Sequence, residues 1–226
     1  MTKMNITNAD EIYIGPAYHE AAYAANGRKG IPVNFVTRID LGTPNVLDAD
    51  GYAQSQTPLG AGNLTLNGAL AGEADVARNV TITSAGDDHT KTFTVYGTDH
   101  YGVSVIEAIT GANAGVAAGK KAFKTVTRIA VSAATADAVT AGTGDVLGLP
   151  IRIASADRIL SAAFDGAVEA IAAFVAAVDT TATATTGDVR GTVDMTSALN
   201  NKAVIVNVIA DASTGAAAYG VTQYAG

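Results

Sequence analysis

The chain has 226 residues, enough for one large or two small domains with a buried core. It carries 14 Lys and Arg against 21 Asp and Glu, so its formal net charge of −7 argues against a general phosphate-neutralising surface and against nucleic acid as the partner. It has no cysteine, which excludes disulfides, thiolate metal sites and cysteine nucleophiles.

Two observations bear on membranes. The most apolar run, residues 170–178, is far shorter than the roughly 20 residues that a membrane-spanning helix needs. The first residues, "MTKMNITNADEIY", lack the apolar core of a secretory signal. We therefore expect a soluble protein that is made in the cytoplasm and has no membrane partner.

Residues 1–75 are rich in turn-forming sequence and contain four of the five prolines. One convincing strand is expected there, at residues 33–39. This density of turn-forming residues predicts an extended, irregular N-terminal arm rather than a domain with its own core. The strand could be added to the sheet edge of a neighbouring molecule.

Three tyrosines of this arm follow one another at a spacing of five, which fits neither one helix face nor one strand face. We interpret them as anchors on another surface, such as that of a neighbouring subunit, because tyrosine provides a large contact area at little entropic cost. The alternative is that they cover the protein's own core. The interface candidates of the arm are Tyr13, Tyr18, Tyr23, Val33, Phe35 and Val36.

From residue 76 onward the pattern is that of β-strands. Val80, Ile82, Phe93 and Val95 are spaced by two with threonines between them, which is the period of half-buried strands. With residues 103–109 they predict a three-strand meander. We expect residues 76–226 to form one β-domain, or two β-subdomains at 76–153 and 154–226.

Two turns of this meander hold an aspartate next to a histidine: Asp87-Asp88-His89 and Asp99-His100. Successive turns of a meander lie at opposite ends of the sheet, roughly 17–20 Å apart, so the two pairs cannot share one ion. We interpret both as polar loop tips. The alternative is an oxygen-ligated cation bound at Asp87-Asp88. No metal or cofactor is expected.

The next strands contain a run of basic residues and one glutamate, Glu107, whose positions can be interpreted from the alternation. The basic run Lys120, Lys121, Lys124 and Arg128 is predicted to form the solvated face of a strand. In the strand expected at residues 121–132, Phe123, Thr125, Thr127, Ile129 and Val131 alternate with Lys124, Val126, Arg128 and Ala130. Glu107 has the parity of Val103, Val105 and Ile109, so it should point toward their apolar face. Glu107 could then lie at the solvent-exposed end of its strand, or it could pair with a cation such as Arg128. The third alternative is a catalytic carboxylate whose pKa is raised by burial.

Known catalytic motifs are missing. The glycine-rich run at residues 111–121 has Ala114 where a P-loop needs its first glycine, and Lys121 where it needs a hydroxyl. There is neither a Gly-x-Ser-x-Gly elbow nor a His-Glu-x-x-His pair. General acid–base catalysis needs a second positioned group, and the sequence specifies none. We therefore do not expect an enzyme.

The last third is alanine-rich. Residues 146–154 predict a strand that Pro150 makes irregular or places at an edge. Residues 158–178 could be a helix by propensity, but Asp165-Gly166 between apolar flanks favours a hairpin. A threonine-rich loop at 180–188 precedes a buried strand at 202–211 and a final strand at 216–226. The whole pattern predicts an all-β fold, an antiparallel β-sandwich or barrel-like domain.

Six segments share a threonine- and glycine-rich composition with β-type alternation: "NVTITSAGDD", "KTFTVYGTD", "EAITGANAG", "FKTVTRIAVSAAT", "TGDVLGLPIRIA" and "AAYGVTQYAG". Together they resemble the threonine- and glycine-rich β-domains of head decoration (cement) proteins, virion structural proteins of tailed bacteriophages. The resemblance covers roughly residues 60–226 and carries no catalytic residues.

The resemblance implies a virion protein on the outer capsid surface. It would stabilise the assembled head by bridging subunits of the major capsid protein, and it would associate with itself, commonly as a trimer. Two other functions stay open. One is a tail or fibre subunit that contacts host glycans through Tyr96, His100 and Tyr101. The other is a hydrolase that uses Asp88 and His89.

Overall fold

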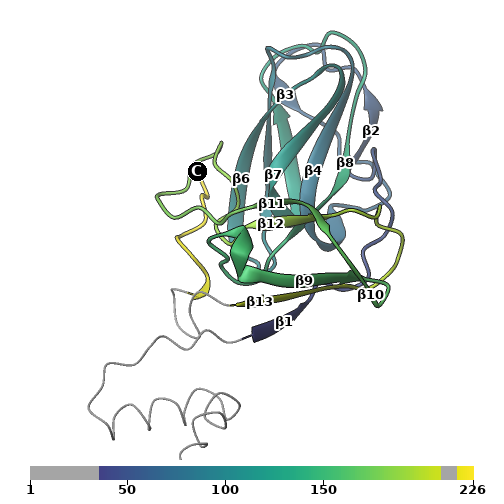
Figure 1. Ribbon diagram of the computed structural model, residues 1–226. Coiled ribbons are helices and arrows are strands. Elements are labelled where there is room, and N and C mark those ends of the chain that lie inside the picture. Colours follow the sequence, from purple (N-terminus) through teal and green to yellow (C-terminus); the bar gives the residue numbers. More distant parts are fainter. Residues whose placement is uncertain (1–35, 210–217) are drawn as a thin grey trace, which may run out of the picture.

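The computed structural model describes residues 36–209 and 218–226 (Figure 1). In these residues the fold is all-β, as predicted, and they include a short 3-10 turn, η2 (Ala156–Arg158). The strands are β1 (Val36–Asp40), β2 (Ala53–Gln56), β3 (Gly62–Asn63), β4 (Glu73–Asp87), β5 (Thr92–Thr98), β6 (Ser104–Thr110), β7 (Asn113–Val131), β8 (Val139–Gly148), β9 (Ile159–Phe164), β10 (Ala167–Glu169), β11 (Ile171–Val175), β12 (Thr192–Met195) and β13 (Val204–Ile209).

The larger sheet has nine antiparallel strands. Its order is β11-β12-β8-β4-β7-β5-β6, with β2 added to β8 and β3 to β7. Strand β7 has 19 residues and pairs with β4 along its first part and with β5 along its second. Several register shifts bend the long strands. The sheet therefore curves around its own core in the upper part of Figure 1.

The smaller sheet has four antiparallel strands in the order β1-β13-β9-β10. In Figure 1 it lies below β11 and β12, and its strands run across the direction of the long strands. A second core cluster fills the space between the sheets, with side chains from β12, β13, β9 and the segment after β8. The arrangement is a β-sandwich in which part of the larger sheet curves around a core of its own.

Period-two alternation predicted the buried positions of the first core. Val80, Ile82, Phe93 and Val95 are all fully buried. The predicted three-strand meander is wrong in one pairing, because β7 lies between β4 and β5 and only β5 and β6 are neighbours. The shared face expected within residues 121–132 is also broken, since a register shift between Tyr96 and Gly97 makes Val126 buried while Thr127 is exposed.

The N-terminal region contributes to both sheets. Strand β1 pairs with β13 of the same chain, which confirms the described part of the strand predicted at residues 33–39. Strand β2 pairs with β8, and Tyr52 is fully buried in the first core. The boundary drawn after residue 75 falls inside β4. The rest of the predicted arm, residues 1–35, lies outside the described residues.

The hairpin at Asp165-Gly166 is confirmed and the helix is not. These two residues have φ values of 52° and 81°, as a tight two-residue turn requires, and they connect β9 to β10. The strand predicted at 202–211 is also confirmed for its described part, since β13 lies in the interior of the smaller sheet.

Of the two strands predicted at the carboxyl side, the one at residues 146–154 is confirmed only for residues 146–148, and the one at residues 216–226 is wrong for its described part. Strand β8 ends at Gly148, before Pro150, and residues 149–154 continue as irregular chain that is nevertheless hydrogen-bonded through Leu149 and Ile153. Residues 218–226 form no strand. Single hydrogen bonds fix them instead, from Arg152 N to Ala218 O and from Ile106 N to Tyr224 O, and Gly220 at φ 80° packs against the main chain of Val189.

The close contact of β8 with the loop before β2 gives a first prediction. A Cβ at Gly142 would lie 1.8 Å from the carbonyl oxygen of Asp48, whereas a Cβ at Gly60 would meet nothing within 4 Å. We expect Gly142→Ala to lower the free energy of unfolding by about 3 kcal/mol, because main chain must move. The control Gly60→Ala should change it by less than about 0.5 kcal/mol. Urea unfolding measures both, and equal stabilities would contradict the packing described.

Candidate functional site

The two Asp-His pairs are separate sites with different environments. His89 donates from Nδ1 to Asp87 Oδ1 (2.6 Å) at an exposed turn, and this hydrogen bond lowers the pKa of Asp87. Asp88 and Asp99 are fully buried, so the interpretation as polar loop tips is wrong for these two residues. Asp88 accepts a hydrogen bond from Ala136 N (2.8 Å), which fixes the loop before β8.

Asp99 is the centre of a buried polar cluster. Its Oδ1 accepts hydrogen bonds from the main-chain N–H groups of Tyr101 (2.8 Å) and Val103 (3.0 Å). Its Oδ2 accepts from Arg190 Nη2 (2.8 Å) and Gln223 Nε2 (3.2 Å). Burial acts to raise the pKa of Asp99, but the Arg190 charge and these hydrogen bonds outweigh burial and hold the pKa below its usual value.

Glu107 points into the apolar interior, as its parity predicted. Burial raises its pKa to about 7, although it accepts hydrogen bonds from the main-chain N–H groups of Lys120 and Lys121. The predicted pairing with Arg128 is wrong, because that guanidinium lies over the ring of Tyr96, 3.4 Å from its centroid. Both carboxylate oxygens therefore bind main chain of the chain's own strand β7.

Lys121 is fully buried, so its assignment to a solvated face is wrong. Its Nζ donates to the carbonyl oxygens of Ile106 (3.1 Å) and Thr183 (2.9 Å), because the threonine-rich loop covers this part of β7. Nearby, Asp188 accepts from Ala122 N (3.2 Å) and Arg190 N (2.9 Å), and burial raises its pKa. These groups tie the loop and the C-terminal segment to the sheet.

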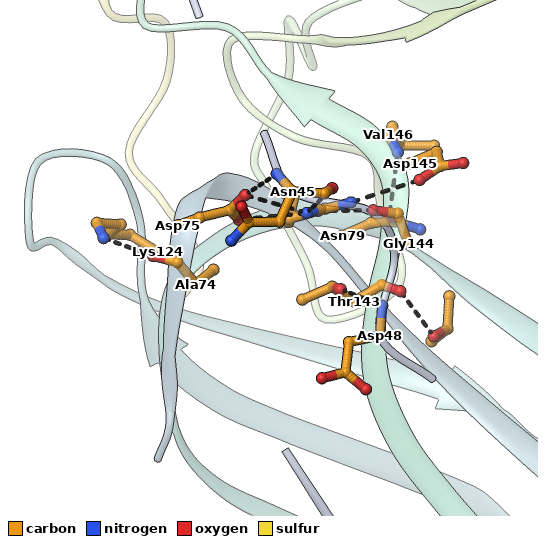
Figure 2. A network of polar contacts seen from close by, with 12 residues as sticks. Asn45, Asp48, Ala74, Asp75, Asn79, Lys124, Thr143, Gly144, Asp145 and Val146 are labelled. Atoms are coloured by element: carbon orange, nitrogen blue, oxygen red, sulfur yellow. Dashed lines mark hydrogen bonds and ion pairs between the residues drawn. The ribbon is translucent and has the colours of Figure 1, made fainter. Parts of the chain in front are cut away.

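A third buried cation, Arg78, connects β4 to β8 and to the loop before β2. Arg78 of β4 is almost fully buried and donates to the carbonyl oxygens of Gly144 (2.7 Å) and Asn45 (3.1 Å). It also forms ion pairs with Asp75 (3.2 Å) and Asp145 (3.4 Å). Figure 2 labels four of these partners, which come from β4, β8 and the loop before β2: Asn45, Asp75, Gly144 and Asp145. Every polar contact is internal, so the network is structural.

The surface feature best suited to binding is a groove of about 670 Å³ between the β9–β10 hairpin and β11. Most of the side chains that line it are apolar, and two of the large ones are open to solvent: Val168 is 78% exposed and Leu160 is 50% exposed. The residues that line this groove are Ala156, Ile159, Leu160, Ser161, Ala162, Val168, Glu169, Ala170, Ile171, Ala172, Ala173 and Phe174.

Local sequence explains why the groove exists. The tight turn at Asp165-Gly166 starts a return strand of only three residues, and β10 ends at Glu169, opposite Ala162. Glu169 is held there by Ser197, whose N–H (3.0 Å) and Oγ (2.6 Å) donate to its carboxylate. The chain then crosses to the other sheet as β11. Alanines at the crossing have too little volume to fill the gap.

Two strand edges border the groove. The outer edge of β9 has no paired strand beyond Ala162 in the described part of the chain. Strand β11 is the outermost strand of the larger sheet there and pairs only with β12. An extended apolar segment placed in the groove could bind main chain as well as side chains. Among its lining residues only Glu169 is titratable, and that carboxylate is already bonded to Ser197.

The interface candidates from the sequence are placed only in part. Val36 begins the edge strand β1 and is largely exposed. The other candidates lie outside the described residues: Tyr13, Tyr18, Tyr23, Val33 and Phe35. Sequence reasoning did not find the groove, although the two-residue turn that builds it was recognised.

A smaller hollow of about 450 Å³ lies beside the buried Asp99 cluster. Tyr101 and Tyr219 form its wall, with their ring centroids 5.3 Å apart and edge to face. His100 packs against Tyr101 in the same manner, at 4.9 Å. Tyr96, the other aromatic residue considered for glycan contact, has one face covered by Arg128.

Comparisons with protein-family models, with curated proteins and with solved structures find no match for this chain. Within residues 36–209 and 218–226, no three acidic or histidine side chains are grouped in a way that could hold a metal ion. Helices long and apolar enough to cross a bilayer are likewise missing from the described residues.

The buried ion pair gives a second prediction. We expect Arg190→Met to lower the free energy of unfolding by about 3–5 kcal/mol, because Asp99 would be left buried without its charged partner. Lys202 and Asp165 form an equally short pair (2.7 Å) at the surface, so Lys202→Met should cost less than about 1 kcal/mol. Chemical denaturation of both variants checks this, and a mild Arg190 phenotype would contradict a structural role for the cluster.

Glu107 gives a prediction on pH. Its pKa is about 7 in the folded chain and 4.5 in the reference state, so the folded state binds the proton more tightly. Stability should therefore fall as the pH rises from 4.5 to about 7, by about 3 kcal/mol for this group, and then level off. Unfolding by urea across this range measures the fall.

Glu107→Gln should flatten this dependence, because no proton is then released on unfolding or bound on folding. Glu73→Gln, at the exposed end of β4, serves as the control and should keep the fall. An unchanged pH profile in Glu107→Gln would show that other groups cause it.

Proposed function

We propose that this protein is a capsid decoration (cement) protein of a tailed bacteriophage, which binds the outer surface of the assembled head and bridges major capsid protein subunits. The observation that carries the proposal is the apolar groove bordered by the edges of β9 and β11. Such a site grips an extended segment of another protein and offers no positioned acid–base pair.

The energetics of a decoration protein suit this surface. A ligand that binds only the assembled shell stabilises it by mass action, so no chemistry is needed. Exposure of the apolar side chains of Val168 and Leu160 to water is unfavourable. A strand of a capsid protein that buried them would remove this unfavourable free energy. Association of copies, as a trimer, would multiply modest contacts. The net charge of −7 is compatible with an outer position, away from packaged DNA.

A tail or fibre subunit is the second candidate. The pair of partly exposed rings, Tyr101 and Tyr219, beside a hollow of about 450 Å³ favours it, because aromatic faces stack on sugars. Electron microscopy of virions with the protein labelled separates the two proposals. Label on the head supports the cement protein, and label on the tail supports the fibre subunit.

Binding to heads tests the proposed function directly. Purified protein is added to heads that lack it, and the bound fraction is measured by sedimentation. Val168→Glu should weaken binding at least about tenfold, because a charge would enter the apolar groove. Heads without the protein should also burst at a lower temperature than decorated heads.

Leu59→Glu is the matched control for this experiment. Leu59 is 92% exposed in the loop between β2 and β3, and these two strands lie in the upper part of Figure 1, away from β9 and β10. It should bind heads like the unaltered protein. Equal binding by Val168→Glu and the control would remove the groove from the attachment surface, and heads indifferent to the protein would refute the proposed function.

A further inference from the structure

We propose that the hollow walled by Tyr101 and Tyr219 is a binding site for one pyranose ring of a neutral saccharide. Its volume of about 450 Å³ lies within the range of small-molecule sites, about 300–1,000 Å³. The inference goes beyond the proposed function, because a protein that only grips shell subunits needs no ligand of this kind.

An unsatisfied acceptor in the wall of the hollow is the first argument. Gln223 is only 7% exposed and lines the hollow. Its Nε2 donates to Asp99 Oδ2 (3.2 Å), and because an ionised carboxylate accepts and cannot donate, this contact fixes which end of the amide faces Asp99. The amide oxygen, Oε1, is buried and has no hydrogen-bond partner within the described part of the chain. A buried acceptor without a donor is unfavourable, so a ligand hydroxyl that donates to Oε1 would be held there.

The segment that carries Gln223 can admit a ligand. Residues 218–226 form no strand. Their main chain is held before and after the residues that line the hollow, where Arg152 N donates to Ala218 O and Ile106 N donates to Tyr224 O. The wall between these two bonds can shift slightly without breaking a strand ladder. A ligand therefore reaches Oε1 by a small displacement of this wall.

Two half-exposed aromatic rings supply the apolar part of the site. Tyr101 and Tyr219 stand edge to face with their centroids 5.3 Å apart, so their faces are turned in different directions. The hydroxyl of Tyr101 donates to Pro150 O (2.7 Å), which holds this ring in place before any ligand arrives. Val103, also half-exposed, extends the apolar surface. The face of an aromatic ring is electron-rich, so it attracts the weakly positive C–H groups on the apolar face of a pyranose.

The charges of the hollow favour a neutral ligand. Arg190 and Asp99 both line it, and they form an ion pair with each other (2.8 Å). Arg190 also donates from Nε to Leu149 O (3.1 Å). A phosphate or an ammonium ion in this hollow would meet charges that are already paired. A saccharide brings both an apolar face and hydroxyl donors, which are the two features that the rings and Gln223 can use.

An NMR titration of the full-length, isotope-labelled protein tests the site. The probes are glucose, galactose, mannose and N-acetylglucosamine, with inorganic phosphate as a charged comparison. We expect at least one sugar to shift the amide signals of Tyr101, Gly220 and Gln223 saturably, with a Kd on the order of 1–10 mM, and phosphate to leave them unchanged. The absence of a saturable shift with every sugar up to roughly 50 mM, or equal binding of phosphate, overturns the proposal.

Two substitutions test whether the sugar lies in the hollow. Tyr219→Leu removes a ring but keeps apolar volume, and it should weaken binding about fivefold. Gln223→Met removes the unpaired acceptor and should weaken binding about three- to tenfold, as expected for one hydrogen bond. Tyr96→Leu is the matched control and should leave the Kd unchanged, because one face of that ring is already covered by Arg128.

The amide spectrum of each variant shows whether it is folded. Because Tyr219 is half-exposed, Tyr219→Leu keeps the test decisive even if Gln223→Met does not fold. An unchanged Kd in either folded variant, or an equal loss in Tyr96→Leu, rules out the hollow as the site.

The tetrasaccharide of the sugar that binds best separates two sources of the ligand. Tighter binding than that of the single sugar indicates a polysaccharide, and equal or weaker binding indicates a free sugar. The pyranose chemistry of the site is the same in both cases.

The hollow shares no lining residue with the groove between the β9–β10 hairpin and β11. Tyr219→Leu should therefore bind heads like the unaltered protein, and the titration itself uses no heads. Failure of sugar binding leaves the head-binding result standing, and failure of head binding leaves the saccharide site standing.

Discussion

The fold depends on strand β7, which must pair with β4 along one part and with β5 along the other. The change of partner occurs near Thr125, where Gly97 approaches so closely that a Cβ would lie 1.9 Å from the Thr125 carbonyl oxygen. The register shift at this point leaves Thr127 unpaired and bends the strand. This bend lets one sheet enclose a core by itself and still present β12 and β11 to the smaller sheet.

The buried ions serve the same architecture. Arg78, Arg190 and Lys121 each bind a carbonyl oxygen of an irregular segment: those of Asn45, Leu149 and Thr183. Irregular chain cannot satisfy its own polar groups, so a cation with several donors takes over the role of a neighbouring strand. The groove is the contrasting case. Its strand edges receive no such partner within the described residues, which is why it stands out as a place for binding.

Local periodicity predicted which residues are buried, and it predicted little about neighbours. Val80, Ile82, Phe93 and Val95 are correct because parity alone decides the face of a strand. The position of β7 between β4 and β5 could not be predicted from the sequence, because the alternation of buried and exposed residues in a strand does not depend on which strand is its neighbour. A bulge such as that at Thr127 changes parity without any mark in the sequence.

The candidate site shows the same division. The turn at Asp165-Gly166 was readable because two consecutive positive φ values require such residues. The groove was not, because it results from the short length of β10 and from alanines that leave space between sheets distant in sequence. Burial of Lys121 depends on a carbonyl oxygen of Thr183, 62 residues away, which no local pattern contains.

The long antiparallel pairing of β4 with β7 has a mechanical consequence. Its partners run from Glu73 with Thr125 to Asp87 with Asn113, and the ladder hydrogen bonds lie across the strand axis. Tension along that axis would have to shear many bonds at once, whereas tension across it would unzip them singly. A molecule that holds its surroundings together under pressure would therefore be strongest when loaded along β4 and β7, and its orientation would matter as much as its affinity.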